Sequence, residues 1–143
     1  MTIYENDGKL DADAAKVGCY CLSIAHYHPD ITDEEFDAAW EQAKAKGILD
    51  SSDILKAPQG FVNLLGYMLT YRDGHWPADT PLDPANMHIV GEWHNDNTGF
   101  THFVVMDGKG TGKENVTYDP IEGGSRTVRE GYFVSYRIFD KVA

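Results

Sequence analysis

The sequence lacks long hydrophobic runs, has few basic residues and contains only two cysteines. No apolar stretch approaches the roughly 18 residues that a membrane-spanning helix needs, so we expect no transmembrane segment. Its 12 Lys and Arg residues are outnumbered by 23 Asp and Glu residues, which gives a net charge of −11. Such a polyanion repels nucleic acid and anionic lipid, which excludes both as bulk partners. Two cysteines do not make a disulfide framework, so we expect free thiols and synthesis in a reducing compartment.

The first 16 residues also lack the features of a secretory signal. They are acidic, with neither a basic leading region nor an apolar core. We therefore expect cytoplasmic synthesis, and release by lysis or delivery to a cell wall is compatible with it. There is no internal repeat and no low-complexity tract, and 42% of the 143 residues are hydrophobic. These properties predict one folded domain over residues 1–143, and nothing in them indicates an oligomeric state.

The first half of the chain has helical patterns. Thr32 and Glu35 form a capping box, and Phe36, Trp40 and Ala43 follow on one helical face. This spacing predicts the main helix, which Gly47 would end.

Two shorter helices are expected on either side of it. One covers residues 18–27 and ends before Pro29. The other covers the segment PQGFVNLLG, with Pro58 in its first turn and Gly66 after its end. The helical part therefore spans about residues 18–66.

The second half, about residues 67–140, has the patterns of strands. The expected strands are YMLTYR, MHIVGEW, FTHFVVMD, NVTYD and GYFVSYRIF. Most of the intervening turns are short, which predicts a mostly antiparallel sheet. The segment FTHFVVMD is apolar on both faces and should be central, with helices covering one side. Helices followed by strands predict an α+β domain.

Three residues in this scaffold suggest nucleophilic catalysis. Cys19 follows Gly18 at the beginning of a helix, where unpaired N–H groups favour a thiolate. His102 lies in the most apolar strand and can accept and return the thiol proton. Asp119 ends the next strand and can orient the imidazole, because neighbouring strands lie roughly 5 Å apart. We predict Cys19, His102 and Asp119 as catalytic residues.

The motifs around these residues resemble a known family. GCYCLSIAH is similar to the nucleophile helix of bacterial C39-like cysteine peptidases, which have the papain-like fold. HFVVMDG resembles the histidine strand of that family, and VTYDPIEGG resembles its Asp-Pro strand end. The resemblance implies Cys19 as nucleophile, His102 as base and Asp119 as orienting carboxylate, with no cofactor. Gly18 would clear the approach to the thiol, and Trp93 would line the substrate cleft or merely pack.

One position departs from the family pattern. Papain-like enzymes usually have a glutamine about six residues before the cysteine, which donates a hydrogen bond to the oxyanion. Here that position is Asp13, and a carboxylate would oppose the oxyanion unless it is protonated. The remaining candidate donors are the backbone N–H of Cys19 and, more weakly, the side chain of Asn6. The domain is therefore slow, inactive or completed by another residue.

Several residues also have simpler, non-catalytic interpretations. Cys21 is expected in the core, and Ser23 is expected to pack or cap. His94 is a rival base, although its place beside a polar turn favours simple exposure. Asp119 followed by Pro120 is also a common turn pair.

Metal binding is a weaker alternative. Glu5, Asp7 and Asp11 fall near the ligand positions of a calcium loop, but Ile3 and Ala14 occupy the first and last positions. A solvated acidic loop is the preferred interpretation. Zinc bound through both cysteines and a histidine is a second alternative, although the spacing is unusual for a structural site.

The sequence thus favours a cysteine peptidase or amidase that acts on a peptide or a peptidoglycan peptide. A free-standing domain fits a phage-type lysin or a delivered toxin better than a transporter-linked peptide processor. The first alternative is a catalytically impaired binding domain on the same scaffold, suggested by Asp13. The second is an acyltransferase with the same Cys, His and Asp order, such as a transglutaminase-like or arylamine-acetylating relative.

Overall fold

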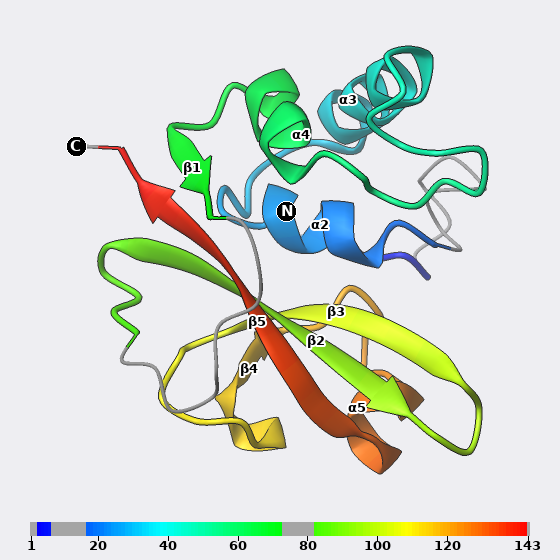
Figure 1. The fold of residues 1–143 in the computed structure, drawn as a ribbon, viewed down its shortest axis with the longest axis vertical. Helices are drawn as coiled ribbons and strands as arrows, with labels where there is room; N and C mark the ends of the chain where they lie inside the picture. Colours follow the sequence, from blue (N-terminus) through cyan, green and yellow to red (C-terminus); the bar gives the residue numbers. More distant parts are fainter. Residues whose placement is uncertain (1–2, 7–16, 73–81, 143) are drawn as a thin grey trace.

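The structure, a computed structural model, describes residues 3–6, 17–72 and 82–142 (Figure 1). The helices are α2 (Cys19–Ala25), α3 (Asp33–Ala45), α4 (Pro58–Leu65), α5 (Arg126–Glu130) and the 3-10 helix η1 (Lys113–Asn115). The strands are β1 (Leu69–Tyr71), β2 (Met87–Asn95), β3 (Phe100–Met106), β4 (Val116–Tyr118) and β5 (Tyr132–Lys141). The predicted α+β class and the three predicted helices are confirmed.

The five strands form one sheet in the order β1-β5-β2-β3-β4, and all the described pairs are antiparallel. The last strand therefore inserts between β1 and β2. Ile138 and Phe139 of β5 are adjacent and both 0% exposed, so β5 is covered on both faces and belongs inside the sheet. Strand β3 is also interior, as predicted, although the middle strand is β2.

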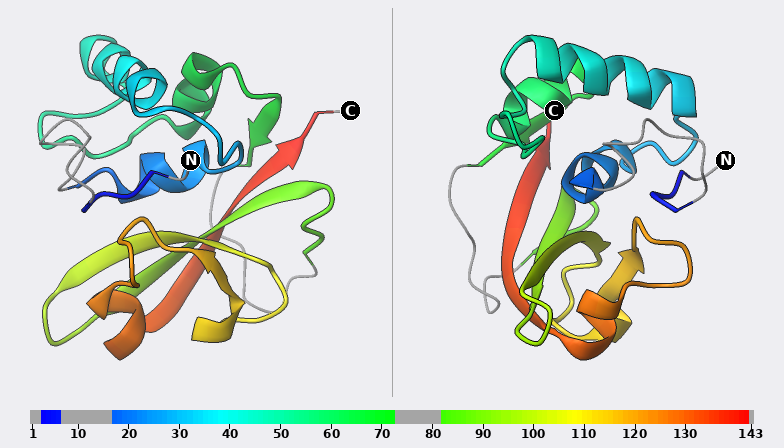
Figure 2. Two further views of the ribbon diagram at one scale, coloured as in Figure 1. Left: turned by 180° about the vertical axis from the view of Figure 1, so that it is seen from behind. Right: turned by 90° about the vertical axis from the view of Figure 1, so that its right-hand side faces the viewer.

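The N-terminal helices lie together on one side of the sheet (Figures 1 and 2). The predicted capping box begins α3: the Thr32 side chain accepts a hydrogen bond from Glu35 N at 3.1 Å. Phe36, Trp40 and Ala43 of this helix are all 0% exposed. Helix α2 lies between the other two helices and the sheet, and its last five residues are buried.

Two apolar cores fill the molecule. The first joins the helices to the sheet and includes Leu22, Trp40 and Phe139. The second lies on the other side of the sheet and includes Trp93 and Tyr136.

Helix α5 closes the second core and has no counterpart among the predicted elements. Ser125 caps it, because its Oγ accepts a hydrogen bond from Val128 N at 3.2 Å. Val128 is buried in the second core. Five residues carry too short a pattern to predict a helix, so this one depends on its cap and on the surface it covers.

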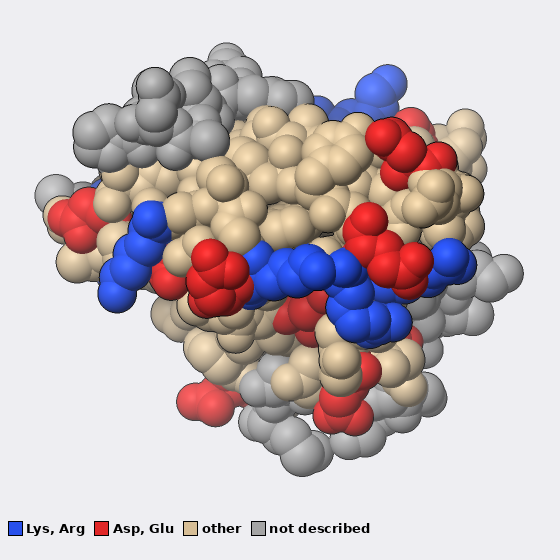
Figure 3. All heavy atoms as spheres, turned by 90° about the horizontal axis from the view of Figure 1, so that it is seen from below, with Lys and Arg blue, Asp and Glu red and all other residues tan. Residues whose placement is uncertain are grey.

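Within the described part of the chain, no helix combines the length and apolarity needed to cross a membrane. Figure 3 shows the face seen from below the view of Figure 1, where Lys and Arg side chains are interspersed with Asp and Glu. Charges of both signs therefore share this face.

Candidate active site

His102 and Asp119 meet at the edge of the sheet formed by β3 and β4. Nε2 of His102 lies 2.7 Å from Oδ1 of Asp119, and both side chains are at most 10% exposed. Antiparallel pairing sets Val105 opposite Tyr118, so the chain after Tyr118 returns towards His102. The strand register therefore brings these two residues together, as the sequence suggested.

The carboxylate of Asp119 is also held by its own turn. Oδ1 accepts a hydrogen bond from the backbone N–H of Ile121, and Oδ2 accepts one from that of Ser125, both at 2.9 Å. Burial raises the pKa of Asp119, but the hydrogen bonds from His102 and from the two N–H groups outweigh it and lower the pKa. Asp119 is thus a fixed carboxylate and also the turn residue that the Asp-Pro pair suggested.

Cys19 is the first residue of α2 and lies half-buried beside the imidazole. Its sulfur and a ring nitrogen of His102 lie within 4.8 Å of each other, and the two side chains are hydrogen bonded. Burial lowers the pKa of His102, but hydrogen bonds to Asp119 and Cys19 outweigh it and raise the pKa to about 10. His102 therefore carries a proton at neutral pH between two acidic partners.

Helix α2 is held against the sheet by Ser23, one turn after Cys19. The hydroxyl of Ser23 donates a hydrogen bond to the carbonyl oxygen of Phe103 at 3.1 Å. The carbonyl oxygen of Ser23 lies 2.7 Å from Nε2 of His88 on β2. Tyr20 stacks on Phe103 with 4.2 Å between ring centroids. These contacts position the thiol relative to His102.

A third acidic residue enters the site from the N-terminal segment. A carboxylate oxygen of Glu5 lies within 4.8 Å of both the Cys19 sulfur and a nitrogen of His102. The sequence suggested Glu5 only as a weak calcium ligand. Its place beside Cys19 has no sequence signal, because no periodic element links the two positions.

Two predicted auxiliary residues occupy other places. Asn6 Nδ2 donates to the carbonyl oxygen of Glu122 at 3.3 Å, and Asn6 Oδ1 accepts from Glu122 N at 2.9 Å. The side chain of Asn6 is thus engaged at the surface, which does not fit an oxyanion donor. Trp93 is only 2% exposed and packs in the second core, so it offers no surface to a substrate. Gly18, the N-cap of α2, is itself buried.

Other predicted positions lie either outside the described residues or away from the site. Asp13, Asp7 and Asp11 lie outside the described residues. Cys21 is 2% exposed within the first core, as expected, so a zinc site built on both thiols does not fit. His94, the rival base, faces Thr101 at 3.1 Å and Asp96 at 3.4 Å.

Glu5, Cys19 and His102 are, among the described residues, the group with ligand-type atoms close enough to share a metal ion. We assign no metal to this group. Two of its three members, Cys19 and His102, are hydrogen bonded to each other. The arrangement fits proton exchange between thiol and imidazole.

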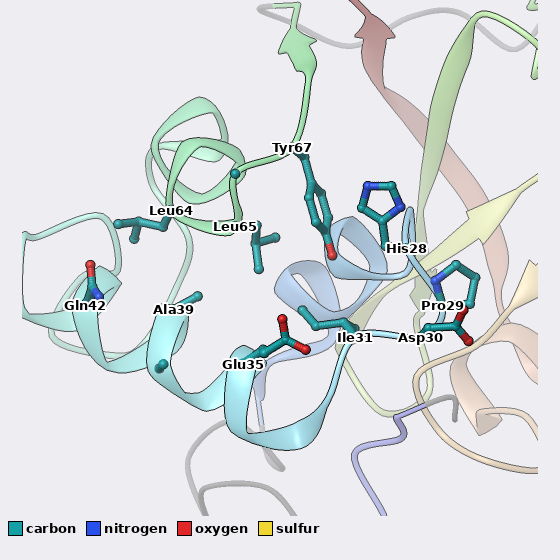
Figure 4. A pocket seen from close by; sticks show the side chains of 12 residues that line it. His28, Pro29, Asp30, Ile31, Glu35, Ala39, Gln42, Leu64, Leu65 and Tyr67 are labelled. Carbon is teal, nitrogen blue, oxygen red and sulfur yellow. The ribbon is translucent and has the colours of Figure 1, made fainter.

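A hollow of about 550 Å³ lies where the helical and sheet parts meet. Tyr20 and Phe103, which follow Cys19 and His102 in sequence, line it together with Tyr71 and Arg137. A larger hollow of about 710 Å³ lies between the end of α2, α3 and α4 (Figure 4). Cys19, His102 and Asp119 line neither hollow, but the neighbours of Cys19 and His102 line only the smaller one. We therefore regard the smaller hollow as the candidate substrate site.

The chain was compared with known proteins. No curated protein and no solved structure matches it. A family model described as "Protein of unknown function, DUF261" matches residues 1–141. Because this match covers nearly all of the 143 residues, the chain belongs to the DUF261 family.

Proposed function

We propose that this protein is a cysteine hydrolase that cleaves an amide bond in a peptide or peptidoglycan peptide. The observation that carries the proposal is the arrangement of His102, hydrogen bonded to Cys19 and to Asp119 at once. An imidazole between a thiol group and a buried carboxylate can take up and return protons beside a cysteine nucleophile.

Each step of the reaction uses one of these groups. The Cys19 thiolate attacks the carbonyl carbon, and a carbon–sulfur bond forms. His102 gives its proton to the leaving amine, and the carbon–nitrogen bond breaks to leave a thioester. A water molecule then gives a proton to His102 and attacks the thioester, which releases the acid and restores the thiolate. Since Asp119 holds Nε2, Nδ1 exchanges these protons.

The hollow lined by Tyr20, Tyr71, Phe103 and Arg137 supports a peptide substrate. Stacked aromatic rings suit an extended chain with an apolar side chain. The guanidinium of Arg137 lies 5.5 Å from the centre of the Phe103 ring and is paired with Glu92, with 3.2 Å between Nη2 and Oε1. The similarity of the Cys, His and Asp-Pro motifs to C39-like peptidases supports the same chemistry on a papain-like fold.

Selective reaction of the two thiols tests the proposal. The native protein is treated with iodoacetamide and, separately, with p-nitrophenyl acetate, and the modified residue is identified by mass spectrometry. We expect rapid modification at Cys19 and none at Cys21, since Cys21 is buried and burial raises its pKa. Cys19→Ala should abolish the burst of p-nitrophenolate, while the matched variant Cys21→Ala should retain it.

Three outcomes would contradict a hydrolase. A burst of equal size in Cys19→Ala would place the chemistry elsewhere. Slow alkylation of Cys19, at the rate of an ordinary exposed thiol, would favour a binding domain without catalysis. Transfer of the acetyl group to an added amine, in preference to water, would instead identify an acyltransferase.

A further inference from the structure

The backbone around Glu5 is fastened to the turn that carries Asp119. The N–H of Glu5 donates to the carbonyl oxygen of Pro120 at 2.7 Å. The hydroxyl of Tyr118 donates to the carbonyl oxygen of Ile3 at 2.6 Å, and this bond is buried. Glu5 therefore has a fixed place beside the catalytic pair, although it lies 14 positions before Cys19 in the sequence.

The side chain of Glu5 is buried and incompletely bonded. It is 7% exposed, and its Oε1 has no hydrogen-bond partner among the described residues. The charged and titratable groups around it are Cys19 from α2, His102 from β3 and Asp119 after β4. Burying an oxygen atom without a hydrogen-bond partner destabilises the fold. A group kept in such a position calls for a functional explanation.

The raised pKa of Glu5 would let its side chain act as a hydrogen-bond donor. Burial raises its pKa to about 7, with the positive charge of His102 acting against this and the negative charge of Asp119 adding to it. Below neutral pH the group is a neutral carboxyl with one O–H to donate. Above neutral pH it becomes a carboxylate, which would repel a negatively charged oxygen.

We propose that Glu5 is a catalytic residue whose protonated carboxyl donates a hydrogen bond to the oxyanion formed when Cys19 attacks a carbonyl group. This inference rests on the proposed hydrolase function. Glu5 supplies the donor that papain-like enzymes usually take from a glutamine and that Asp13 cannot supply as a carboxylate. The proton stays on Glu5 while the tetrahedral carbon forms and collapses.

The test compares two reactions of Cys19 in the full-length protein. Acylation by p-nitrophenyl acetate passes through an oxyanion: the sulfur–acetyl bond forms, and p-nitrophenolate leaves with the electron pair of the broken bond. Alkylation by iodoacetamide displaces iodide from a saturated carbon and forms no oxyanion. Both rates are measured between pH 5.5 and about 9 for the wild type, Glu5→Ala and Glu5→Gln, since ordinary carboxyl titration ends well below this range. Circular dichroism verifies the fold of each variant.

We expect Glu5→Ala to slow acylation by about 100- to 1000-fold at the acid end of the range, the usual loss for one oxyanion donor. Alkylation should change by less than about 3-fold, because only the oxyanion donor is lost. The wild-type acylation rate should fall as pH rises through about 7, where Glu5 loses its proton. Glu5→Gln should restore much of the rate lost in Glu5→Ala and remove this decline, because an amide donates at every pH.

Equal losses of acylation and alkylation in Glu5→Ala would overturn the inference, because Glu5 would then act only by positioning the thiol. A Glu5→Gln profile that declines like the wild type would also overturn it. A wild-type burst that Glu5→Ala leaves unchanged overturns this inference alone and preserves the hydrolase. Absence of a burst in the wild type overturns both proposals together.

Discussion

The hydroxyl of Ser23 donates a hydrogen bond of 3.1 Å to the carbonyl oxygen of Phe103. Ser23 is 0% exposed and lies one helical turn after Cys19, while Phe103 is the neighbour of His102. This single bond therefore joins the helix that carries the thiol to the strand that carries the imidazole. Because Ser23 is fully buried, water does not readily replace its hydroxyl group when the bond is lost.

Removing this bond should loosen the site and destabilise the protein. Ser23→Ala leaves the carbonyl group of Phe103 without this donor, so we expect a loss of about 1–3 kcal/mol in the free energy of unfolding. The acylation rate of Cys19 should fall as well, because small displacements of a nucleophile are costly. Urea denaturation and the p-nitrophenyl acetate burst measure the two effects. Ser51→Ala, at an exposed position, is the control and should change neither.

Asp119→Asn should remove the negative charge of the carboxylate and keep the shape of the side chain. Without the negative charge the imidazolium loses a stabilising partner, so the pKa of His102 should drop from about 10. We expect acylation to slow by about 100- to 10,000-fold, the range for a disturbed general acid–base group. The pH profile of alkylation reports the shift of His102 directly.

Asp83→Asn is the matched control for this change. Asp83 Oδ1 also accepts a backbone N–H, from Ala85 at 3.0 Å, but at an exposed turn. An equal loss of acylation in both variants would refute a specific role of Asp119.

His88 should make the fold sensitive to acid. Its ring is 7% exposed, and burial lowers its pKa from 6.5 to about 4. The unfolded chain binds a proton more tightly, so the free energy of unfolding should decrease as pH falls from 6.5 to about 4. The contribution is about 3 kcal/mol at full effect.

The variant His88→Gln should flatten this part of the stability curve, measured by urea denaturation at several pH values. His28→Gln, at an exposed position, should leave the slope as in the wild type. A slope that His88→Gln does not change would assign the acid sensitivity to other groups.

Gly131 joins α5 to β5 at a point of close backbone approach. A Cβ atom there would lie 2.2 Å from the carbonyl oxygen of Thr127 and 2.3 Å from that of His94. Gly131→Ala should therefore cost about 1–3 kcal/mol, because backbone atoms must move. Gly60→Ala in α4 is the contrast: its Cβ would lie 3.0 Å from the flexible end of Ile48 and 3.6 Å from the Cβ of Ala57. A melting temperature equal to the wild type in Gly131→Ala would contradict the close approach.

The helices were predictable because their signals are local. Thr32 and Glu35 lie within one turn and form their capping box without help from distant residues. Pro58 and Gly66 likewise mark the two ends of α4, where Gly66 adopts a positive φ of 75°. Helix α5 shows the limit of such signals, since its packing against the second core is a tertiary property.

The strands were predictable but their order was not. Alternation and apolar runs locate β2, β3 and β5, yet short connections favour neighbours in sequence as neighbours in the sheet. The insertion of β5 between β1 and β2 follows from burial on both faces, which depends on the helices above and α5 below. For Trp93 the sequence left a cleft and a core open, because an aromatic residue suits both equally well, and the structure buries it in the second core.

The sequence by itself determined the three N-terminal helices, the main strands and the reactive groups at Cys19, His102 and Asp119, because capping, periodicity and motif spacing are encoded within short segments. Only the tertiary structure decided that Glu5 lies beside Cys19 and His102. It also decided that Asn6 binds the backbone of Glu122. These contacts arise where the N-terminal segment crosses the turn after β4, with 115 positions between Ile3 and Tyr118. No local rule predicts such a contact, since it forms only when the sheet and α2 have already placed both partners.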